Sequence, residues 1–368
     1  MNCKTVLLKD LVLGEKGSYG IGAPAVDYDP KKYTYLRITD INDDGSINTN
    51  GLKSVDAEDA YKYILQENDI VFARTGASTG KTYFYQPQDG TLVYAGFLIK
   101  FSIDPQKVNP RLLKYITHSQ EYYNWVRSFD TGGTRGNINA VTFANMPITL
   151  PNRATQDKIV AILSSLDDKI ELNRRINTNL EQQAQALYKS WFVDADTTGW
   201  GTKKLADFFN VITGKKDANY STKDGVYPFF TCSQDILKAP NYSFEGAAIL
   251  LAGNGDFNVK RYIGKFEAYQ RTYVLIPFEK RYHSFLYLLI KYHLQEITGG
   301  SRGSVIKFIT KGNIADFTFT MPPYSINDKL FLFDSLFNEI DKNTKEINNL
   351  STIRDTLLPK LMSGEIKV

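Results

Sequence analysis

The sequence predicts an α+β protein in which two mixed α/β domains are separated by a long antiparallel two-helix coiled coil. Three observations predict this class: the chain repeats itself, each half contains β-rich stretches, and each half ends in an amphipathic helical pattern. We therefore expect a pseudo-two-fold internal repeat. The expected segments are two domains at 1–152 and 197–322, a central helix at 153–196 and a C-terminal helix at 323–368.

The clearest sign of duplication is a short glycine-rich string that occurs twice. The letters TGGTRG at 131–136 return as TGGSRG at 298–303. Soon after each copy comes a strand-like run that ends in proline, ITLP at 148–151 and FTMP at 319–322. Both halves thus share the order glycine-rich string, strand, proline and helix, which indicates two copies of one folding unit.

A long helical pattern follows each proline. From Gln156 to Trp191, and again from Ile326 to Leu361, apolar residues recur at spacings of three and four. Each pattern covers 36 residues, which is about 54 Å at the rise of an α-helix. Pro359 should loosen the last turn of the second helix. Plausible N-caps are Asn152 and Thr155 for the first helix and Ser325 for the second.

Helices of this length are too long to be covered by one small domain, so we expect them to pack on each other as a coiled coil. Because each helix follows its own domain, antiparallel packing would place the domains at opposite ends of a rod. Two ordinary surface helices are the alternative. The asparagines at 173, 177 and 343 either fix the register of the seam or lie on the surface. The residues expected in the seam or at a partner's docking surface are Ile159, Leu163, Leu166, Ile170, Leu180, Leu187, Phe333, Phe337, Ile340, Ile347, Leu350 and Leu357.

The two domain segments contain β-rich stretches separated by turn residues. They include DIVFAR at 69–74, KTYFYQ at 81–86, LVYAGFLIKFSI at 92–103 and QRTYVLIPF at 270–278. Aromatic-rich helical patterns at 109–129 and 282–297 come before the two glycine-rich strings. Each domain should therefore be a β-structure that is completed by a short helical region.

Composition narrows the classes of function. Two cysteines without a CxxC pattern argue against a disulfide framework or a zinc site and fit a reducing, cytoplasmic compartment. No apolar run approaches the ~20 residues that span a bilayer, so we expect no membrane association. The segment 197–322 carries 16 basic and 10 acidic residues, whereas 1–152 carries 16 of each. Charge therefore gives only weak support for a nucleic-acid partner.

The string DIVFARTGASTGKT at 69–82, the two TGG-x-R strings and the two long helices make the whole chain similar to the specificity subunits of type I restriction-modification systems. This resemblance implies that each domain recognises one half of a bipartite, gapped DNA site in the major groove. It also implies that the helices separate the domains and dock two methyltransferase (modification) subunits, and that restriction subunits join this core. By the same resemblance the chain is non-catalytic and binds no cofactor, and S-adenosylmethionine, ATP and Mg²⁺ belong to its partners.

Candidate DNA contacts lie on glycine-containing turns, which allow close approach of the backbone to a ligand. Arginine or lysine there can bind guanine or phosphate, although an exposed hairpin with incidental charges is the alternative. For the arginines in the TGG-x-R strings, a DNA contact and an ion pair between domain and helix are both open. The candidates are Arg74, Thr75, Gly76, Ser78, Thr79, Lys81, Arg135, Asn137, Asn254, Asn258, Lys260, Arg261, Arg302 and Ser304.

Catalytic alternatives are weaker. GASTGKT at 76–82 is one residue too short between its glycines for a phosphate-binding P-loop. MPPY at 321–324 resembles the Asn/Asp-Pro-Pro-Tyr motif of DNA adenine methyltransferases, but Met321 cannot accept the hydrogen bond of the target amine. Three histidines without metal-ligand spacing predict no metal site. A methyltransferase and a coiled-coil scaffold that never touches DNA are the alternatives to the DNA-specificity function.

Overall fold

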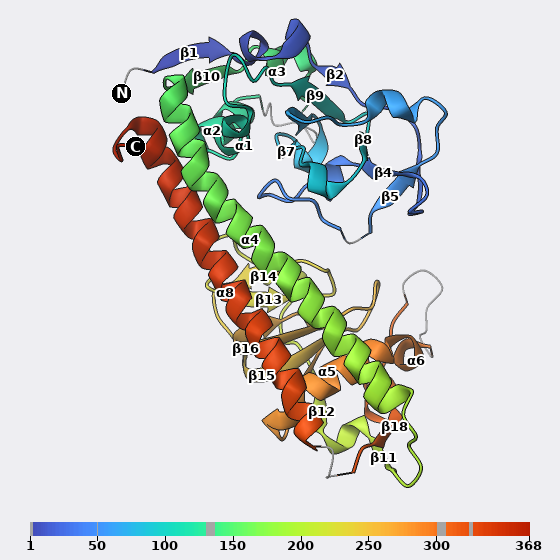
Figure 1. Ribbon diagram of the computed structural model, residues 1–368. Coiled ribbons are helices and arrows are strands. Elements are labelled where there is room, and N and C mark those ends of the chain that lie inside the picture. Colours follow the sequence, from blue (N-terminus) through green and yellow to red (C-terminus); the bar gives the residue numbers. More distant parts are fainter. Residues whose placement is uncertain (1–2, 50, 130–136, 300–306, 324–326) are drawn as a thin grey trace. The chain divides into compact units, whose positions relative to one another are not determined.

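The computed structural model describes residues 3–49, 51–129, 137–299, 307–323 and 327–368 (Figure 1). The chain divides into two compact units: unit 1 is Met1–Ile170 with Asn348–Val368, and unit 2 is Glu171–Ile347. Both units contain part of the long helices α4 (Arg153–Tyr188) and α8 (Asn327–Ser363). Because the units divide inside these helices, the predicted four-segment organisation stays a prediction.

Two four-stranded sheets form the domain of unit 1. The first has the order β2-β9-β6-β7 with antiparallel neighbours. Its strands are β2 (Ser18–Tyr19), β9 (Leu98–Ser102), β6 (Asp69–Ala73) and β7 (Thr82–Phe84). The second has the order β3-β5-β4-β8, with β4 and β8 parallel. Its strands are β3 (Ala25–Asp27), β5 (Lys53–Val55), β4 (Tyr33–Leu36) and β8 (Leu92–Tyr94).

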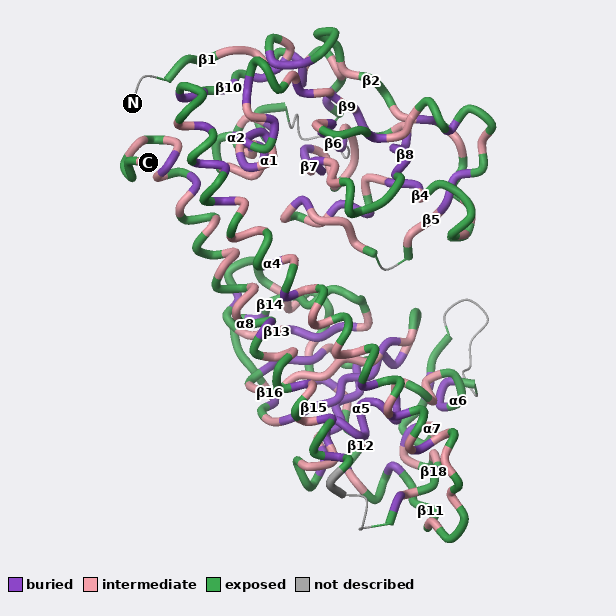
Figure 2. The backbone as a smooth tube through the Cα atoms, in the orientation of Figure 1, coloured by how far each residue is buried: buried purple, intermediate pink, exposed green. Residues whose placement is uncertain are grey.

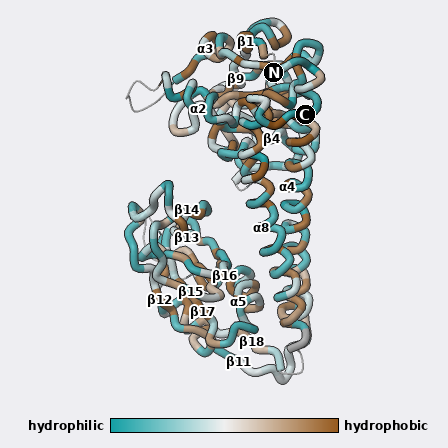
Figure 3. The backbone as a smooth tube through the Cα atoms, turned by 90° about the vertical axis from the view of Figure 1, so that its left-hand side faces the viewer, coloured by the Kyte–Doolittle hydropathy of each residue, from teal (hydrophilic) through white to brown (hydrophobic). Residues whose placement is uncertain are grey.

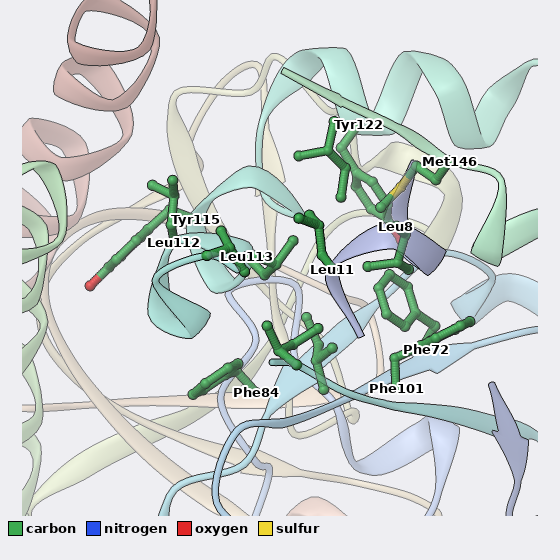
Figure 4. Packing of buried hydrophobic residues seen from close by; sticks show 14 of the residues in the cluster. Leu8, Leu11, Phe72, Phe84, Phe101, Leu112, Leu113, Tyr115, Tyr122 and Met146 are labelled. Carbon is green, nitrogen blue, oxygen red and sulfur yellow. The ribbon is translucent and has the colours of Figure 1, made fainter. Parts of the chain in front are cut away.

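Strand β6 is buried on both faces, which explains its continuous apolar sequence. Successive side chains of a strand point to opposite faces. Ile70 and Phe72 accordingly pack in the cluster that contains the helices, whereas Val71 and Ala73 pack in a second cluster. Figure 4 shows Phe72 and Phe101 packed together beneath Leu8 and Leu11.

The helices of unit 1 are short and lie against the first sheet. They are α1 (Pro110–Ile116), α2 (Gln120–Arg127) and α3 (Ala140–Ala144). The predicted helical stretch at 109–129 is thus broken, because Ser119 caps a new helix by accepting from the Tyr122 amide. Strand β1 (Lys4–Leu7) then pairs antiparallel with β10 (Pro147–Leu150), which brings the chain to the start of α4.

The domain of unit 2 contains a six-stranded sheet of order β12-β17-β15-β16-β13-β14. Its strands are β12 (Phe209–Thr213), β17 (Thr272–Pro277), β15 (Phe244–Ala252), β16 (Val259–Ala268), β13 (Tyr227–Phe230) and β14 (Ile236–Ala239). The helices are α5 (His283–Tyr292), α6 (Leu294–Thr298) and α7 (Lys311–Ala315). Strand β11 (Gly201–Lys204) pairs antiparallel with β18 (Thr318–Met321). Figure 3 shows the hydrophobic residues that gather along β15 and β17.

Several local features occur in both units. The Leu8 amide donates to Met146 O at 2.9 Å, and the Leu205 amide donates to Phe317 O at 3.0 Å. In each unit the first strand of the domain, β1 or β11, also pairs with the strand that precedes a long helix, β10 or β18. The sequence match between LLKDL at 7–11 and KLADF at 204–208 therefore marks equivalent positions.

The long helices pack antiparallel on each other within each unit. In unit 1, Ile159 and Leu163 of α4 share a cluster with Leu358 and Leu361 of α8. In unit 2, Ala184 and Tyr188 of α4 share one with Phe333 and Phe337 of α8. The turns of both helices alternate between buried and exposed residues in Figure 2.

The ends of the helices agree in part with the sequence. The carboxamide oxygen of Asn152 accepts from the Thr155 amide at 3.0 Å, so Asn152 is the N-cap of α4. A π-helical turn at Lys189–Val193 follows α4, and Pro359 lies inside α8. Ser325, the N-cap expected for the second helix, lies outside the described residues.

The expected seam residues differ in burial. Fully buried are Ile159, Leu163, Ile170, Phe333 and Phe337. Half-buried are Leu166, Leu180, Leu187, Ile340, Ile347, Leu350 and Leu357. Asn173 and Asn343 are buried. The Asn173 side chain donates to Glu346 Oε2 at 2.9 Å and that of Asn343 donates to Asn177 Oδ1 at 3.0 Å, so this stretch of the seam is polar.

Candidate nucleic-acid interface

In unit 1 the candidate residues 74–81 form the turn between β6 and β7. The turn has two left-handed glycines, with φ of +72° at Gly76 and +87° at Gly80. A Cβ on Gly80 would lie 2.7 Å from Val126 Cγ1, and the Tyr122 hydroxyl donates to Gly80 O at 2.6 Å. One end of the turn is therefore held against α2, while no atom of the described residues lies within 4 Å of a Cβ on Gly76. Strand β7 follows directly, which is not the helix that a P-loop requires.

Arg74 begins this turn beside an exposed aromatic ring. Its guanidinium carbon lies 5.0 Å from the ring centre of Tyr19, and Nε donates to Asn137 Oδ1 at 3.4 Å. The Tyr19 hydroxyl in turn accepts from the Ala140 amide at 3.2 Å. A guanidinium stacked on a ring keeps its charge while losing part of its freedom. Arg74 is thus oriented, and among the described residues its guanidinium donates one hydrogen bond, from Nε to Asn137.

The same turn contacts the chain just after the first TGG-x-R string. Thr75 forms an isolated antiparallel bridge with Asn137, and the Ile138 amide donates to Arg74 O at 2.9 Å. Asn137 itself is exposed. Two sets of residues that the sequence nominated separately therefore lie together. Arg135, in the string itself, lies outside the described residues.

Other candidates of this turn already have partners. The ammonium of Lys81 pairs with Asp43 at 2.8 Å and donates to Ile41 O at 3.3 Å. The Thr79 hydroxyl donates to Gly76 O at 2.8 Å and shapes the turn. Ser78 lies in the short 3₁₀ turn Gly76–Ser78 and is half-buried.

Unit 2 repeats this arrangement between β15 and β16. Asn254 forms an isolated antiparallel bridge with Phe308, and the Ile309 amide donates to Gly253 O at 3.1 Å. Asn254 thus takes the place of Thr75, and the chain after the second TGG-x-R string takes the place of Asn137. A Cβ on Gly253 would lie 2.5 Å from Arg271 O, which explains a glycine here. Arg302 and Ser304 lie outside the described residues.

Asn258 and Lys260 form a local network. The Asn258 carboxamide donates to Cys232 O at 2.8 Å, and the Lys260 ammonium donates to Ser233 O and to Asn258 Oδ1, both at 2.5 Å. Burial lowers the pKa of Lys260. Both side chains hold the 232–233 segment against β16, and a contact with DNA would need Lys260 to leave these oxygens.

Arg261 lies at the helix junction. Its Nη1 and Nη2 donate to the two carboxylate oxygens of Asp341 on α8 at 2.8 and 2.9 Å. The guanidinium carbon lies 4.6 Å from the ring centre of Phe337, and only 9% of the side chain is exposed. The sequence placed Arg261 at the DNA, whereas the geometry gives it an ion pair between domain and helix. The DNA contact remains a prediction that this geometry does not favour.

The contributions of Tyr19 and Asp43 were not predicted from the sequence. Both come from segments that lie more than 30 residues before the turn they contact, so no local pattern links them to it. Gly20 follows Tyr19 directly, and Gly214 of unit 2 makes a comparable close approach to backbone. A Cβ on Gly20 or on Gly214 would lie within 2.3 Å of a backbone oxygen, of Ala95 and of Tyr269 respectively.

Over the described residues, no group of three or more His, Cys, Asp and Glu side chains could hold a metal ion. Met321 of the MPPY string ends β18, and Tyr324 lies outside the described residues. No helix in the described part of the chain has the length and apolar character to cross a membrane.

In each of the two units, a mixed α/β domain packs on a part of α4 and α8, and the turn of a central hairpin meets the chain after a TGG-x-R string. The family model described as type I restriction modification DNA specificity domain matches residues 2–182 and 197–351. The chain belongs to this family. The model matches twice, once in each half of the chain.

Individual relatives of the chain are specificity subunits of type I restriction enzymes. The specificity subunit of the type I restriction enzyme EcoDI from Escherichia coli is 38% identical over 175 residues, which are 45% of this chain and 38% of that protein. The MjaIX specificity subunit of Methanocaldococcus jannaschii is 25% identical over 303 residues, covering 70% and 69%. The match to the first relative thus spans about two fifths of its length.

A solved structure has the same fold. The crystal structure of a type I restriction-modification S subunit from M. genitalium superposes with a TM-score of 0.56. The match covers 98% of this chain and 96% of that one at 17% identity. At 17% identity this similarity supports the fold alone, so the roles of individual residues are argued from the geometry of this chain.

Proposed function

We propose that the chain is the DNA-specificity subunit of a type I restriction-modification complex, and that each of its domains recognises one half of a bipartite DNA site. The single observation that carries this proposal is the recurrence of one surface in both units. In each, the turn of the central hairpin meets the chain that follows a TGG-x-R string. The family's description as a DNA specificity domain supports DNA as the ligand of this repeated surface.

The proposed DNA contacts follow from what each side chain has left to donate. Arg74 is oriented by Tyr19, and its Nη groups donate to no described residue, which suits bidentate recognition of guanine. Lys81 suits phosphate, because a phosphate oxygen can replace the exposed Asp43 carboxylate. The further contacts proposed for the first domain are Thr75, Gly76, Ser78, Thr79, Arg135 and Asn137. Those proposed for the second are Asn254, Asn258, Lys260, Arg302 and Ser304.

For the helices we propose the role of a spacer that also docks partner subunits. Recognition of two half-sites would need a defined separation of the domains, and a continuous antiparallel helix pair would be suited to provide it. The proposed partners are double-stranded DNA, two methyltransferase subunits and the restriction subunits. S-adenosylmethionine, ATP and Mg²⁺ would be bound by those partners, and this chain would act in the cytoplasm without chemistry of its own.

DNA binding by the complex tests this proposal. The chain would be purified with its modification subunits, and its affinity for duplexes with and without the methylated site would be measured from 50 to 200 mM salt. A DNA-recognising protein should show a steep log–log salt dependence and a clear preference for its site. A complex without such a slope would point to a scaffold, and methyl transfer by the isolated chain would point to a methyltransferase.

A further inference from the structure

One buried carboxylate in unit 1 joins a domain helix to both long helices. Asp167 lies on α4 and accepts from the Lys114 ammonium at 2.7 Å and from the Tyr115 hydroxyl at 3.0 Å, both on α1. Arg354 on α8 donates Nη1 to the other oxygen of Asp167 at 2.9 Å. Three elements of unit 1 therefore meet at a single side chain, which is only 12% exposed.

This contact is ionic as well as buried. Burial opposes the charge on Asp167, but Lys114 and Arg354 outweigh it and hold the pKa of the carboxyl below its usual range. The side chains of Lys114 and Arg354 are 19% and 14% exposed. Figure 4 shows the Tyr115 ring at the margin of the apolar cluster, with its hydroxyl pointing away from the other labelled residues. The domain thus contacts α4 through the Lys114 ammonium and the Tyr115 hydroxyl, which lie at the edge of its apolar core.

Unit 2 contains a contact of the same kind. Glu181 on α4 accepts from the Lys291 ammonium at 2.5 Å and from the Tyr287 hydroxyl at 2.8 Å, both on α5. The second helix is held there by the bidentate pair of Arg261 with Asp341. In each domain, a tyrosine and a lysine of one helix thus donate hydrogen bonds to a carboxylate of α4. An arginine–aspartate ion pair also involves α8 in each unit, Arg354 with Asp167 and Arg261 with Asp341.

Directional contacts of this kind control orientation. Apolar packing of a domain on a helix is non-directional, so it tolerates small rotations about the helix axis. Charge-assisted hydrogen bonds to one carboxylate are short and geometrically restrictive. A domain held through Asp167 at three points, from two other helices, has one favoured rotation on its helix pair.

We propose that Asp167 is a positioning residue that fixes the orientation of the first domain on the long helices and thereby the spacer length that the protein accepts. This inference rests on the proposed function. In B-DNA a turn takes 10–10.5 base pairs, so one base pair of spacer rotates a half-site by about 35°. A domain that can turn on its helices would accept half-sites one base pair nearer or farther.

Methylation of duplexes with altered spacers tests the inference. Complexes that contain the wild-type chain or the Asp167→Asn variant would be given duplexes with the natural spacer and with one base pair more or fewer. We expect the variant to keep its activity on the natural spacer and to lose about tenfold of its preference over the altered ones. Asp167→Glu, which restores the charge, should recover part of that preference.

Two further variants make the result decisive. Glu171→Gln removes an exposed carboxylate of the same helix, where the pair with Arg175 is 3.8 Å long, and should leave the spacer profile unchanged. Tyr115→Phe removes one hydrogen bond to Asp167 and keeps the buried ring, so it should broaden the profile less than Asp167→Asn. If Asp167→Asn does not fold, the Tyr115→Phe profile decides.

The possible outcomes separate this inference from the proposed function. An unchanged spacer preference in folded Asp167→Asn and Tyr115→Phe complexes would overturn the positioning role alone. A wild-type complex that methylates no bipartite site would overturn the proposed function and this inference with it.

Discussion

At the scale of single residues, the structure separates charged side chains that the sequence alone could not distinguish. Arg74 directly follows strand β6, and Arg261 lies near the start of strand β16. Both lie next to glycine-containing turns, and both were predicted to contact DNA. The Arg74 guanidinium lies over the Tyr19 ring and its terminal nitrogens donate to no described residue, whereas both terminal nitrogens of Arg261 donate to Asp341. The difference depends on partners 55 and 80 residues away in the chain, which no periodicity can identify.

Replacement of Arg74 should weaken recognition of one half-site. We expect Arg74→Ala to cost about 1–3 kcal/mol of binding and to relax specificity at one base position. Lys81→Ala should weaken binding to all duplexes equally and reduce the salt slope by about one. Fluorescence anisotropy with the assembled complex measures both effects. Arg175→Ala on α4 is the control, and equal losses for all three variants would contradict these roles.

Replacement of Arg261 should affect stability rather than recognition. Arg261→Met leaves the Asp341 carboxylate without its bidentate partner, at a cost of roughly 1–3 kcal/mol of unfolding free energy. Affinity for DNA, measured per folded complex, should stay as in the wild type. Urea unfolding and anisotropy on one preparation check the pair of results. A variant of unchanged stability that binds its DNA site more weakly would instead support a DNA contact for Arg261.

A buried histidine gives unit 2 a dependence on pH. Burial lowers the pKa of His283 to about 4, although its Nε2 bonds to Ala248 O at 3.0 Å. The unfolded chain takes up a proton near pH 6.5 while the folded chain does not, so stability falls as pH drops from above 6.5 towards 4. The full effect is roughly 3 kcal/mol. His283→Gln should flatten this part of the urea-unfolding profile, and parallel profiles would refute the assignment.

At the scale of elements, hydrophobic periodicity predicted the long helices well and the short ones only in outline. The helix expected from Gln156 to Trp191 is observed as Arg153–Tyr188 with a π-helical turn after it. The stretch at 109–129 is instead two helices, because Ser119 competes for the Tyr122 amide. Seam positions were harder to predict: the sequence nominated Leu166 and Leu180, which are half-buried, while Asn173 is buried beside Glu346.

The central hairpin of unit 1 should respond differently to its two glycines. The Cβ of Gly76→Ala would meet no atom of the described residues, but the residue must adopt a left-handed backbone, at a cost of about 1–2 kcal/mol. Gly80→Ala adds a clash with Val126 and should lower the unfolding free energy clearly more. Thermal unfolding of the two variants compares them directly. Equal losses would mean that α2 does not hold the turn.

At the scale of the whole molecule, the internal duplication was the strongest signal in the sequence. It predicts two similar units, and the family model matches each half of the chain separately. The duplication does not predict which residues differ between the two copies. The turn after β6 carries Arg74, while the equivalent turn in unit 2 begins at Gly253. Divergence of this kind is what two different half-sites would require.

The methylation pattern of genomic DNA from a strain that carries this chain with its modification subunits tests the central claim most directly. If each domain recognises one half of a DNA site, as we propose, the methylated motif should be bipartite, with two short specific parts and an unread gap. A continuous motif, or no motif that depends on this chain, would contradict the account.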